Sequence, residues 1–198
     1  MAFFYLVRHG QTDLIGKMLC GVLPGIHLNE KGRLQAQKAA DFFDYRQIKA
    51  VYTSPIERAS ETAAAIAERV KLESIWVDFL KEIDFGELQS IFETDLKRHS
   101  VWQHFLQNPA EVVFPGGESV NEAQNRVVAG LDALAGQFTK EDRVVCVGHC
   151  EILRLAVCHA IHLPPDYFHY LTIDPASISL LEWSNERKKL RLLNLQPQ

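Results

Sequence analysis

Hydrophobic and polar residues follow two alternating patterns along this chain. Short runs rich in aromatic and β-branched residues predict strands at 3–7, 50–53, 74–77 and 144–147. The segments between these runs carry apolar residues at helical spacing, and they predict helices at about 29–43, 54–70, 93–106, 120–138 and 152–161. Strands that alternate with helices predict an α/β fold: a three-layer α-β-α sandwich whose central sheet is mostly parallel and covered by helices on both faces.

The ends of these elements carry signals of their own. Ser119 and Glu122 form a capping box before the longest helix. The Ser-Pro-Ile-Glu sequence at 54–57 has the same pattern, with proline at the first helical position, and predicts that the second helix is capped by its serine. Two β-rich runs at 177–183 and 189–195 flank a polar turn and predict a C-terminal hairpin.

Composition and charge limit the classes of function. The 198 residues predict a single domain spanning 1–198. A net charge of −4 argues against binding to nucleic acid or to an anionic membrane through overall charge. No apolar run approaches the roughly 20 residues of a membrane helix, and no signal-peptide pattern is seen at the N-terminus. The four cysteines form no Cys-x-x-Cys pair, which predicts free thiols and a cytoplasmic location.

Charged and imidazole side chains follow the predicted strands at the points where these strands end. Arg8 and His9 follow the first strand, Arg58 lies in the first turn of the helix after the second, and His149 follows the strand at 144–147. The carboxyl ends of parallel strands meet at one edge of a sheet, so these side chains are expected to converge there. Two guanidinium groups and two imidazoles would form a pocket for a phosphate-sized anion. Glu82, in an acidic loop, is a candidate proton donor at the same edge.

Six short motifs along the chain resemble those of one known family, the histidine phosphatase superfamily of phosphoglycerate mutase-like proteins. The resemblance covers essentially the whole chain, and the order and spacing of the motifs make it specific. In chain order, the motifs are LVRHGQT at 6–12, LNEKG at 28–32, YTSPIERA at 52–59 with Thr62-Ala63, LKEIDFG at 80–86, PGGES at 115–119 and VGH at 147–149.

This resemblance implies a phosphatase mechanism that requires no metal and no other cofactor. His9 would attack phosphorus and carry a phosphohistidine intermediate. Glu82 would protonate the leaving alkoxide and then activate the water that cleaves the phosphohistidine. Arg8, Arg58 and His149 would bind the phosphate oxygens and stabilise the transferred charge.

The sequence alone leaves alternatives for the catalytic acid and gives only candidates for the residues that contact the substrate. Asp84 and Glu87 lie near Glu82 in the same loop, and either of them could serve as the acid instead. Thr12, Cys20 and Gly21 are candidate substrate-binding residues, because they belong to or follow the first motif.

Several positions depart from the family pattern. Ile15 stands where the family often has asparagine, and Cys20-Gly21 stands where the mutases have a Ser/Thr-Gly pair. The mutases grip a carboxylate with an arginine pair and a tyrosine, for which Lys97-Arg98 is only a weak substitute. These departures favour a phosphatase over a mutase, and the compact chain with its closing hairpin looks most like the α-ribazole-phosphate phosphatase branch of cobalamin synthesis.

The predicted partner is therefore a small phosphorylated metabolite, with α-ribazole 5'-phosphate as the candidate, bound by a monomer or homodimer. Phosphoglycerate mutase-type phosphotransfer and a catalytically inert phosphate-binding module are the alternatives. A metal site is a further, weaker alternative, because several potential ligands lie close in sequence: Cys146, His149, Cys150, His159 and His162.

Overall fold

A central sheet of six strands organises the computed structural model, which describes residues 2–44 and 46–198. The strands are β1 (Ala2–Arg8), β2 (Ile48–Thr53), β3 (Ser74–Trp76), β4 (Arg143–Gly148), β5 (Ile178–Trp183) and β6 (Lys188–Leu195). Their order across the sheet is β3-β2-β4-β1-β5-β6. The first four in this order run parallel, and the hairpin β5–β6 adds antiparallel to β1. The mostly parallel sheet and the closing hairpin are confirmed.

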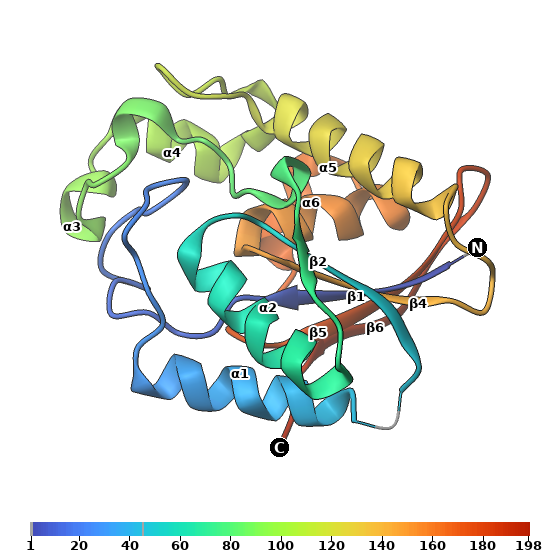
Figure 1. Cartoon of the computed structure of the whole chain (residues 1–198). Helices are drawn as coiled ribbons and strands as arrows, with labels where there is room; N and C mark the ends of the chain where they lie inside the picture. Colours follow the sequence, from blue (N-terminus) through green and yellow to red (C-terminus); the bar gives the residue numbers. More distant parts are fainter. Residues whose placement is uncertain (1, 45) are drawn as a thin grey trace.

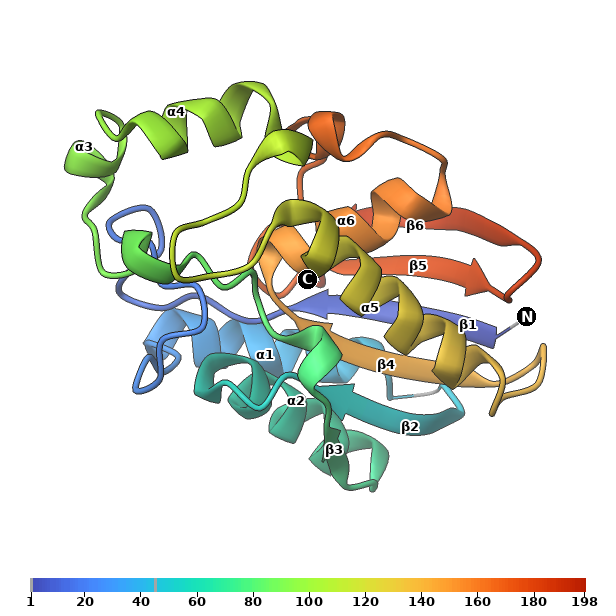
Figure 2. The same ribbon diagram turned by 90° about the horizontal axis from the view of Figure 1, so that it is seen from above.

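Helices cover both faces of this sheet, as the sequence pattern predicts. Figures 1 and 2 show α1 and α2 on one face, and α5 and α6 on the other. The two short helices α3 and α4 lie beyond the carboxyl end of β1, near the loop that follows it. The helices are α1 (Glu30–Phe42), α2 (Glu57–Val70), α3 (Glu93–Leu96), α4 (Ser100–Gln107), α5 (Val120–Ala135) and α6 (Cys150–Ala160).

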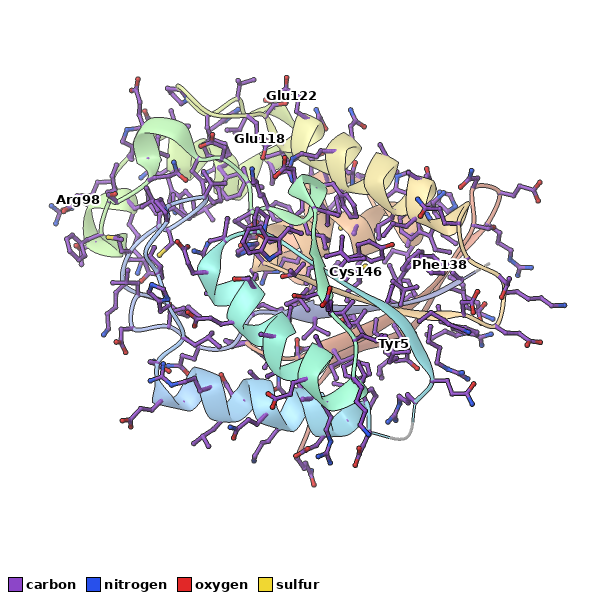
Figure 3. The ribbon with its side chains drawn as sticks, viewed as in Figure 1. Tyr5, Arg98, Glu118, Glu122, Phe138 and Cys146 are labelled. Atoms are coloured by element: carbon purple, nitrogen blue, oxygen red, sulfur yellow. The ribbon has the colours of Figure 1, made fainter. Side chains whose placement is uncertain are left out.

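Side chains of the central strands alternate between two hydrophobic cores, one on each face. In β1, Phe4 and Leu6 join the core under α5 and α6, whereas Tyr5 and Val7 join the core under α1 and α2. In β4, Cys146 likewise faces the first core, and Figure 3 shows it and Tyr5 in the interior of the molecule. Burial on both faces explains why these strands appear as nearly continuous apolar runs.

The predicted serine cap of α2 is wrong. The helix begins at Glu57, its N-cap is Ile56, and no side chain caps it. The Ser54 hydroxyl instead accepts a hydrogen bond from the Ile56 N–H at 3.3 Å and contacts the imidazole of His149. The second predicted box is confirmed, since Ser119 and Glu122 cap each other at the start of α5.

The single helix predicted at 93–106 is two helices, α3 and α4. Leu96 in α3 and Phe105 in α4 are both fully buried. Phe105 follows Leu96 by nine positions. At 3.6 residues per turn, a continuous helix would therefore direct these two side chains to opposite sides. A break between them allows both side chains to reach the core.

Strand register brings the ends of β1, β2 and β4 to one edge. Arg8 pairs with Gly148, and Thr53 pairs with Val147. The next amides continue this alignment, because His9 N–H donates to the Gly148 carbonyl at 2.9 Å. The residues that follow these strands are therefore neighbours in space.

Within the described part of the chain, no helix is both long and apolar enough to cross a membrane.

Candidate active site

A pocket of about 320 Å³ opens at the carboxyl edge of the sheet. Arg8 and His9 line it from the end of β1, Arg58 from the first turn of α2, and Glu82 from the loop before α3. His149 is fully buried, directly behind His9, and the two ring centroids lie 5.1 Å apart. The convergence expected from the strand ends is therefore present, with four side chains at the pocket and the second imidazole behind them.

Hydrogen bonding and burial prepare His9 as a neutral base or nucleophile. Its Nδ1 lies 2.7 Å from the Gly10 carbonyl oxygen, which can only accept, so Nδ1 carries the hydrogen. The lone pair is then on Nε2. Burial, with the charges of Arg58 and Arg8, lowers the pKa of His9 well below its usual value. The imidazole therefore stays neutral at physiological pH, with Nε2 free to react.

The turn that presents His9 depends on a very close backbone approach. A Cβ atom on Gly10 would lie 2.4 Å from the carbonyl oxygen of Gly32 at the start of α1. The Gly10 N–H donates to the Thr62 hydroxyl at 3.0 Å, and that hydroxyl donates to the Arg58 carbonyl at 2.8 Å. One threonine thus ties the end of β1 to the helix that carries Arg58.

Ser54 orients the second imidazole. Its Oγ lies 2.9 Å from His149 Nε2 and accepts from the Ile56 N–H, so its own proton is available for Nε2. With that proton shared with Nε2, Nδ1 of His149 would carry the ring hydrogen, and this nitrogen is buried without a hydrogen-bond partner among the described residues. Burial and the charge of Arg58 lower the pKa of His149, which keeps the ring neutral. The site thus contains, next to His9, a buried imidazole nitrogen that has no partner among the described residues.

Backbone carbonyls hold the two arginines in place. Arg8 Nη1 donates to the Ile173 carbonyl at 2.6 Å, while its buried Nε has no partner within the described residues. Arg58 Nη2 donates to the Gly21 carbonyl at 2.5 Å. These contacts orient both guanidinium groups and leave donor groups for phosphate oxygens, which a guanidinium fork matches well.

Glu82 joins the acid loop to the start of α6. Its Oε1 accepts from the N–H groups of Ile83 and Ile152, both at 3.0 Å, and its Oε2 accepts from that of Glu151 at 3.1 Å. Oε2 has the fewer donors and is therefore the better place for a proton. Burial raises the pKa of Glu82, and the neighbouring Glu151 raises it further, against the opposite effect of the three amide donors. The side chain can thus hold a proton in mildly acidic solution.

Among the acids considered in this loop, only Glu82 lines the pocket that contains His9. Asp84 accepts from the Gly86 N–H at 3.0 Å and faces a second pocket. Glu87 is likewise not among the residues around His9. The position of Glu82 therefore favours it over the two alternatives.

The three candidate substrate-binding residues all line the pocket. Thr12 is buried, and its hydroxyl accepts from the Leu14 N–H at 3.4 Å. Cys20 donates through Sγ to the Met18 carbonyl at 3.4 Å. Gly21 has a positive φ of 48°, and a Cβ atom there would lie 2.2 Å from the side-chain oxygen of Gln89, so this turn requires glycine.

Sequence reasoning missed a charged wall of the pocket. Glu151 and Arg154 on α6 line it and form an ion pair with N–O distances of 3.0 and 3.2 Å. Their spacing of three residues was the available signal, but Glu151 lies just before the helix predicted at 152–161. Lys97 and Arg98 do not line the pocket, and Figure 3 shows Arg98 at the outer edge of the molecule beside α3.

The residues of the weaker metal alternative do not form a common cluster. Among residues 2–44 and 46–198, no group of three or more His, Cys, Asp or Glu side chains is placed to hold one metal ion. Cys146 is fully buried in the core on β4, and burial strongly raises the pKa of its thiol.

Comparisons with known proteins show which family this chain resembles. The profile of the histidine phosphatase superfamily (branch 1) matches residues 4–196. Phosphoserine phosphatase 1 of Hydrogenobacter thermophilus is 28% identical, over 98% of this chain and 93% of its own length. A bifunctional protein of Mycobacterium tuberculosis is 31% identical over 96% of this chain, which spans about half (52%) of that protein.

A solved structure gives the same picture for the fold. The mycobacterial glucosyl-3-phosphoglycerate phosphatase, in complex with VO3, superposes with a TM-score of 0.88 at 25% identity. The match covers 98% of this chain and 99% of that one. The likeness therefore extends over nearly the whole fold.

Proposed function

Because this chain belongs to the histidine phosphatase superfamily and is a phosphatase, we propose that it hydrolyses small phosphomonoesters through a phosphohistidine formed on His9. The observation that carries this proposal is a neutral imidazole whose Nε2 has no partner among the described residues, in one pocket with Arg8, Arg58 and an acid of raised pKa. A nucleophile, an anion clamp and a proton donor are the three parts that phosphoryl transfer needs.

In the first step, Nε2 of His9 attacks phosphorus and the bond from phosphorus to the ester oxygen breaks. The departing alkoxide takes the proton of Glu82. In the second step, the Glu82 carboxylate accepts a proton from water, whose oxygen attacks phosphorus and breaks the bond to Nε2. Arg8, Arg58 and the Nδ1–H of His149 stabilise the phosphoryl oxygens in both steps.

The pocket supports a small substrate. Its volume of about 320 Å³ lies at the lower end of the range of about 300–1,000 Å³ for ligand sites. Beyond the phosphate position, its wall is apolar at Met18, Phe85 and Trp102 and charged at Glu151 and Arg154. A phosphoester whose alcohol part has both apolar and polar groups, such as α-ribazole 5'-phosphate, suits this lining, and phosphoserine is a second candidate because a relative is named for it.

A panel of phosphoesters tests the proposed function. The panel contains α-ribazole 5'-phosphate, phosphoserine, 3-phosphoglycerate and glucosyl-3-phosphoglycerate, each with ³²P in the phosphate. We expect release of inorganic phosphate without any sugar-phosphate cofactor, and an acid-labile, base-stable label on protein quenched during turnover. Isomerised ester without free phosphate would support the mutase alternative instead, and binding without turnover would support the inert module.

Metal removal should leave this activity unchanged, because Arg8 and Arg58 already supply the positive charge that a metal would provide at the phosphate. The measurement compares phosphate release before and after dialysis against EDTA, and again after addition of zinc or magnesium. A loss that either metal restores would contradict the proposed clamp.

We also propose that the chain forms one catalytic domain, acts in the cytoplasm and is a monomer or homodimer. The location is supported by the cysteines, all of which are unpaired thiols: Cys20, Cys146, Cys150 and Cys158. A place in cobalamin synthesis depends on whether α-ribazole 5'-phosphate is the preferred ester in the panel.

A further inference from the structure

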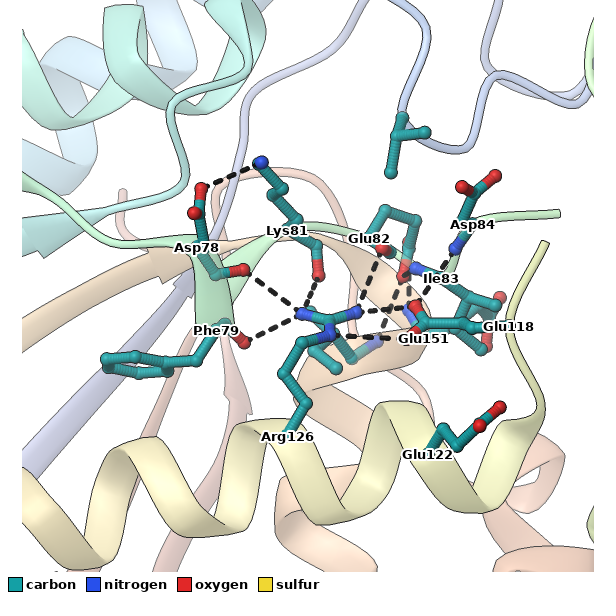
Figure 4. Close-up of polar contacts among 12 residues, drawn as sticks. Asp78, Phe79, Lys81, Glu82, Ile83, Asp84, Glu118, Glu122, Arg126 and Glu151 are labelled. Atoms are coloured by element: carbon teal, nitrogen blue, oxygen red, sulfur yellow. Dashed lines mark hydrogen bonds and ion pairs between the residues drawn. The ribbon is translucent and has the colours of Figure 1, made fainter. Parts of the chain in front are cut away.

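We propose that Arg126 on α5 is a positioning residue for Glu82, an inference that rests on the proposed function. Arg126 is not among the residues that line the pocket with His9. Its guanidinium group instead holds the backbone of the segment that carries the acid, as Figure 4 shows. Its role is to keep the Glu82 carboxyl where the ester oxygen will be.

A single guanidinium group binds four carbonyl oxygens of this segment. Nη1 of Arg126 donates to Asp78 at 3.2 Å, to Phe79 at 3.0 Å and to Lys81 at 3.1 Å. Nη2 donates to the carbonyl of Glu82 itself at 3.2 Å. The acceptors come from both sides of the bend between η1 (Asp78–Leu80) and the acid, so the contacts fix the shape of the bend and not only its distance from α5.

Glu118 orients this guanidinium group and extends the same support. Its Oε1 accepts from Arg126 Nη2 at 2.6 Å, and its Oε2 accepts from Arg126 Nε at 3.2 Å. The same Oε1 accepts from the Asp84 N–H at 3.0 Å, and the Glu118 N–H donates to the Asp84 carbonyl at 3.0 Å. The backbone is therefore held on both sides of Glu82, through one ion pair.

A second pocket opens on the other side of the acid, although Leu80 and Ile83 beside Glu82 are packed in the core. This second pocket has a volume of about 490 Å³, and Arg126 and Glu118 line it. Glu82 lines both pockets and so forms part of the wall between them. Polar contacts, and not packing alone, must then resist movement of this wall. A displacement of about 1 Å at a reacting group can cost roughly 10²-fold in rate.

The test uses two esters that differ in their need for an acid. The leaving group of phenyl phosphate requires protonation, whereas that of 2,4-dinitrophenyl phosphate does not. In Arg126→Met, we expect kcat/KM for phenyl phosphate to fall by roughly 10²-fold. The pre-steady-state burst of dinitrophenolate, which reports attack by His9, should change by less than about 3-fold. An equal loss on both esters, or no loss on either, would overturn the proposal.

Control measurements separate a loss of Glu82 positioning from a general loss of folding or of phosphate binding. Arg69→Met removes a surface arginine that pairs with Asp41 and Asp44, and it should leave both esters unaffected. Thermal unfolding and inhibition by orthovanadate check that Arg126→Met is folded and still binds a phosphate analogue. If it does not fold, Arg126→Lys is measured in its place, since one ammonium group cannot bind all four carbonyls and the same difference between esters is expected.

A double variant gives the most direct test. If Arg126 acts through Glu82, adding Arg126→Met to Glu82→Gln should lower turnover of phenyl phosphate by less than about 3-fold beyond Glu82→Gln alone. A full additional loss of 10²-fold would mean that Arg126 acts elsewhere. Failure of wild-type protein to release phosphate from either ester would instead overturn the proposed function, and this inference with it.

Discussion

Replacement of His9 by alanine should reduce phosphate release by on the order of 10⁴-fold or more, the scale seen when a residue of a covalent catalytic unit is removed. The expected loss has a chemical origin, because Nε2 is the nucleophilic nitrogen of His9, whose Nδ1 is bound to the Gly10 carbonyl, and no phosphohistidine can form without it. Two measurements check this: steady-state release of phosphate, and the acid-labile ³²P label on quenched protein. Both should disappear together.

Two further variants serve as controls for this result. His104→Ala removes an exposed imidazole on α4 that contacts Glu111, and it should keep full activity. His9→Gln retains a polar side chain in the buried site, so it separates loss of the nucleophile from loss of packing. Thermal unfolding close to wild type for His9→Gln, with hydrolysis still lost, is the expected outcome. Substantial turnover in either His9 variant would show that another group receives the phosphoryl unit.

The sequence alone was sufficient to place Arg8, His9 and Arg58 because their positions follow from topology. Each of them directly follows a predicted strand or lies in the first turn of the next helix, and parallel strands end at one edge. Register then brings these ends together, as the pairing of Arg8 with Gly148 shows. No side-chain detail is needed for such a prediction, which is why the α/β fold and most of the site could be inferred together.

Contacts between distant segments could not be inferred in this way. Ser54 has the local pattern of a helix cap, but its hydroxyl contacts His149, 95 residues away in the chain. Ser54 therefore makes a tertiary contact with His149 and does not cap α2. The bonds of Glu82 to the start of α6 and the hold of Arg126 on its loop belong to the same class. A local sequence pattern indicates what a residue could bind nearby. It does not indicate which distant residues the fold places in contact with it.

Replacement of Glu82 by glutamine should slow hydrolysis of an alkyl phosphoester by about 10²–10⁴-fold, the usual contribution of a positioned acid–base group. With 2,4-dinitrophenyl phosphate, the leaving group needs no proton, so attack by His9 should continue. The phosphohistidine should then accumulate, because the carboxylate that activates water is missing. Rapid-quench measurement should show a burst of about one dinitrophenolate per chain, followed by a slow phase.

The pH dependence provides a second test of this residue. The raised pKa of Glu82 keeps it protonated into mildly acidic solution, and its proton is lost as the pH rises through that pKa. The lowered pKa of His9 keeps its imidazole neutral as the pH falls well below the usual value of 6.5. Activity of the wild type should therefore peak on the acidic side and fall toward alkaline pH. For the alkyl ester, Glu82→Gln should lose the part of this alkaline fall that the ionisation of Glu82 causes. Ionisation of the substrate affects both proteins equally, so a comparison of the two profiles removes it. An unchanged profile would assign the alkaline fall to a group other than Glu82.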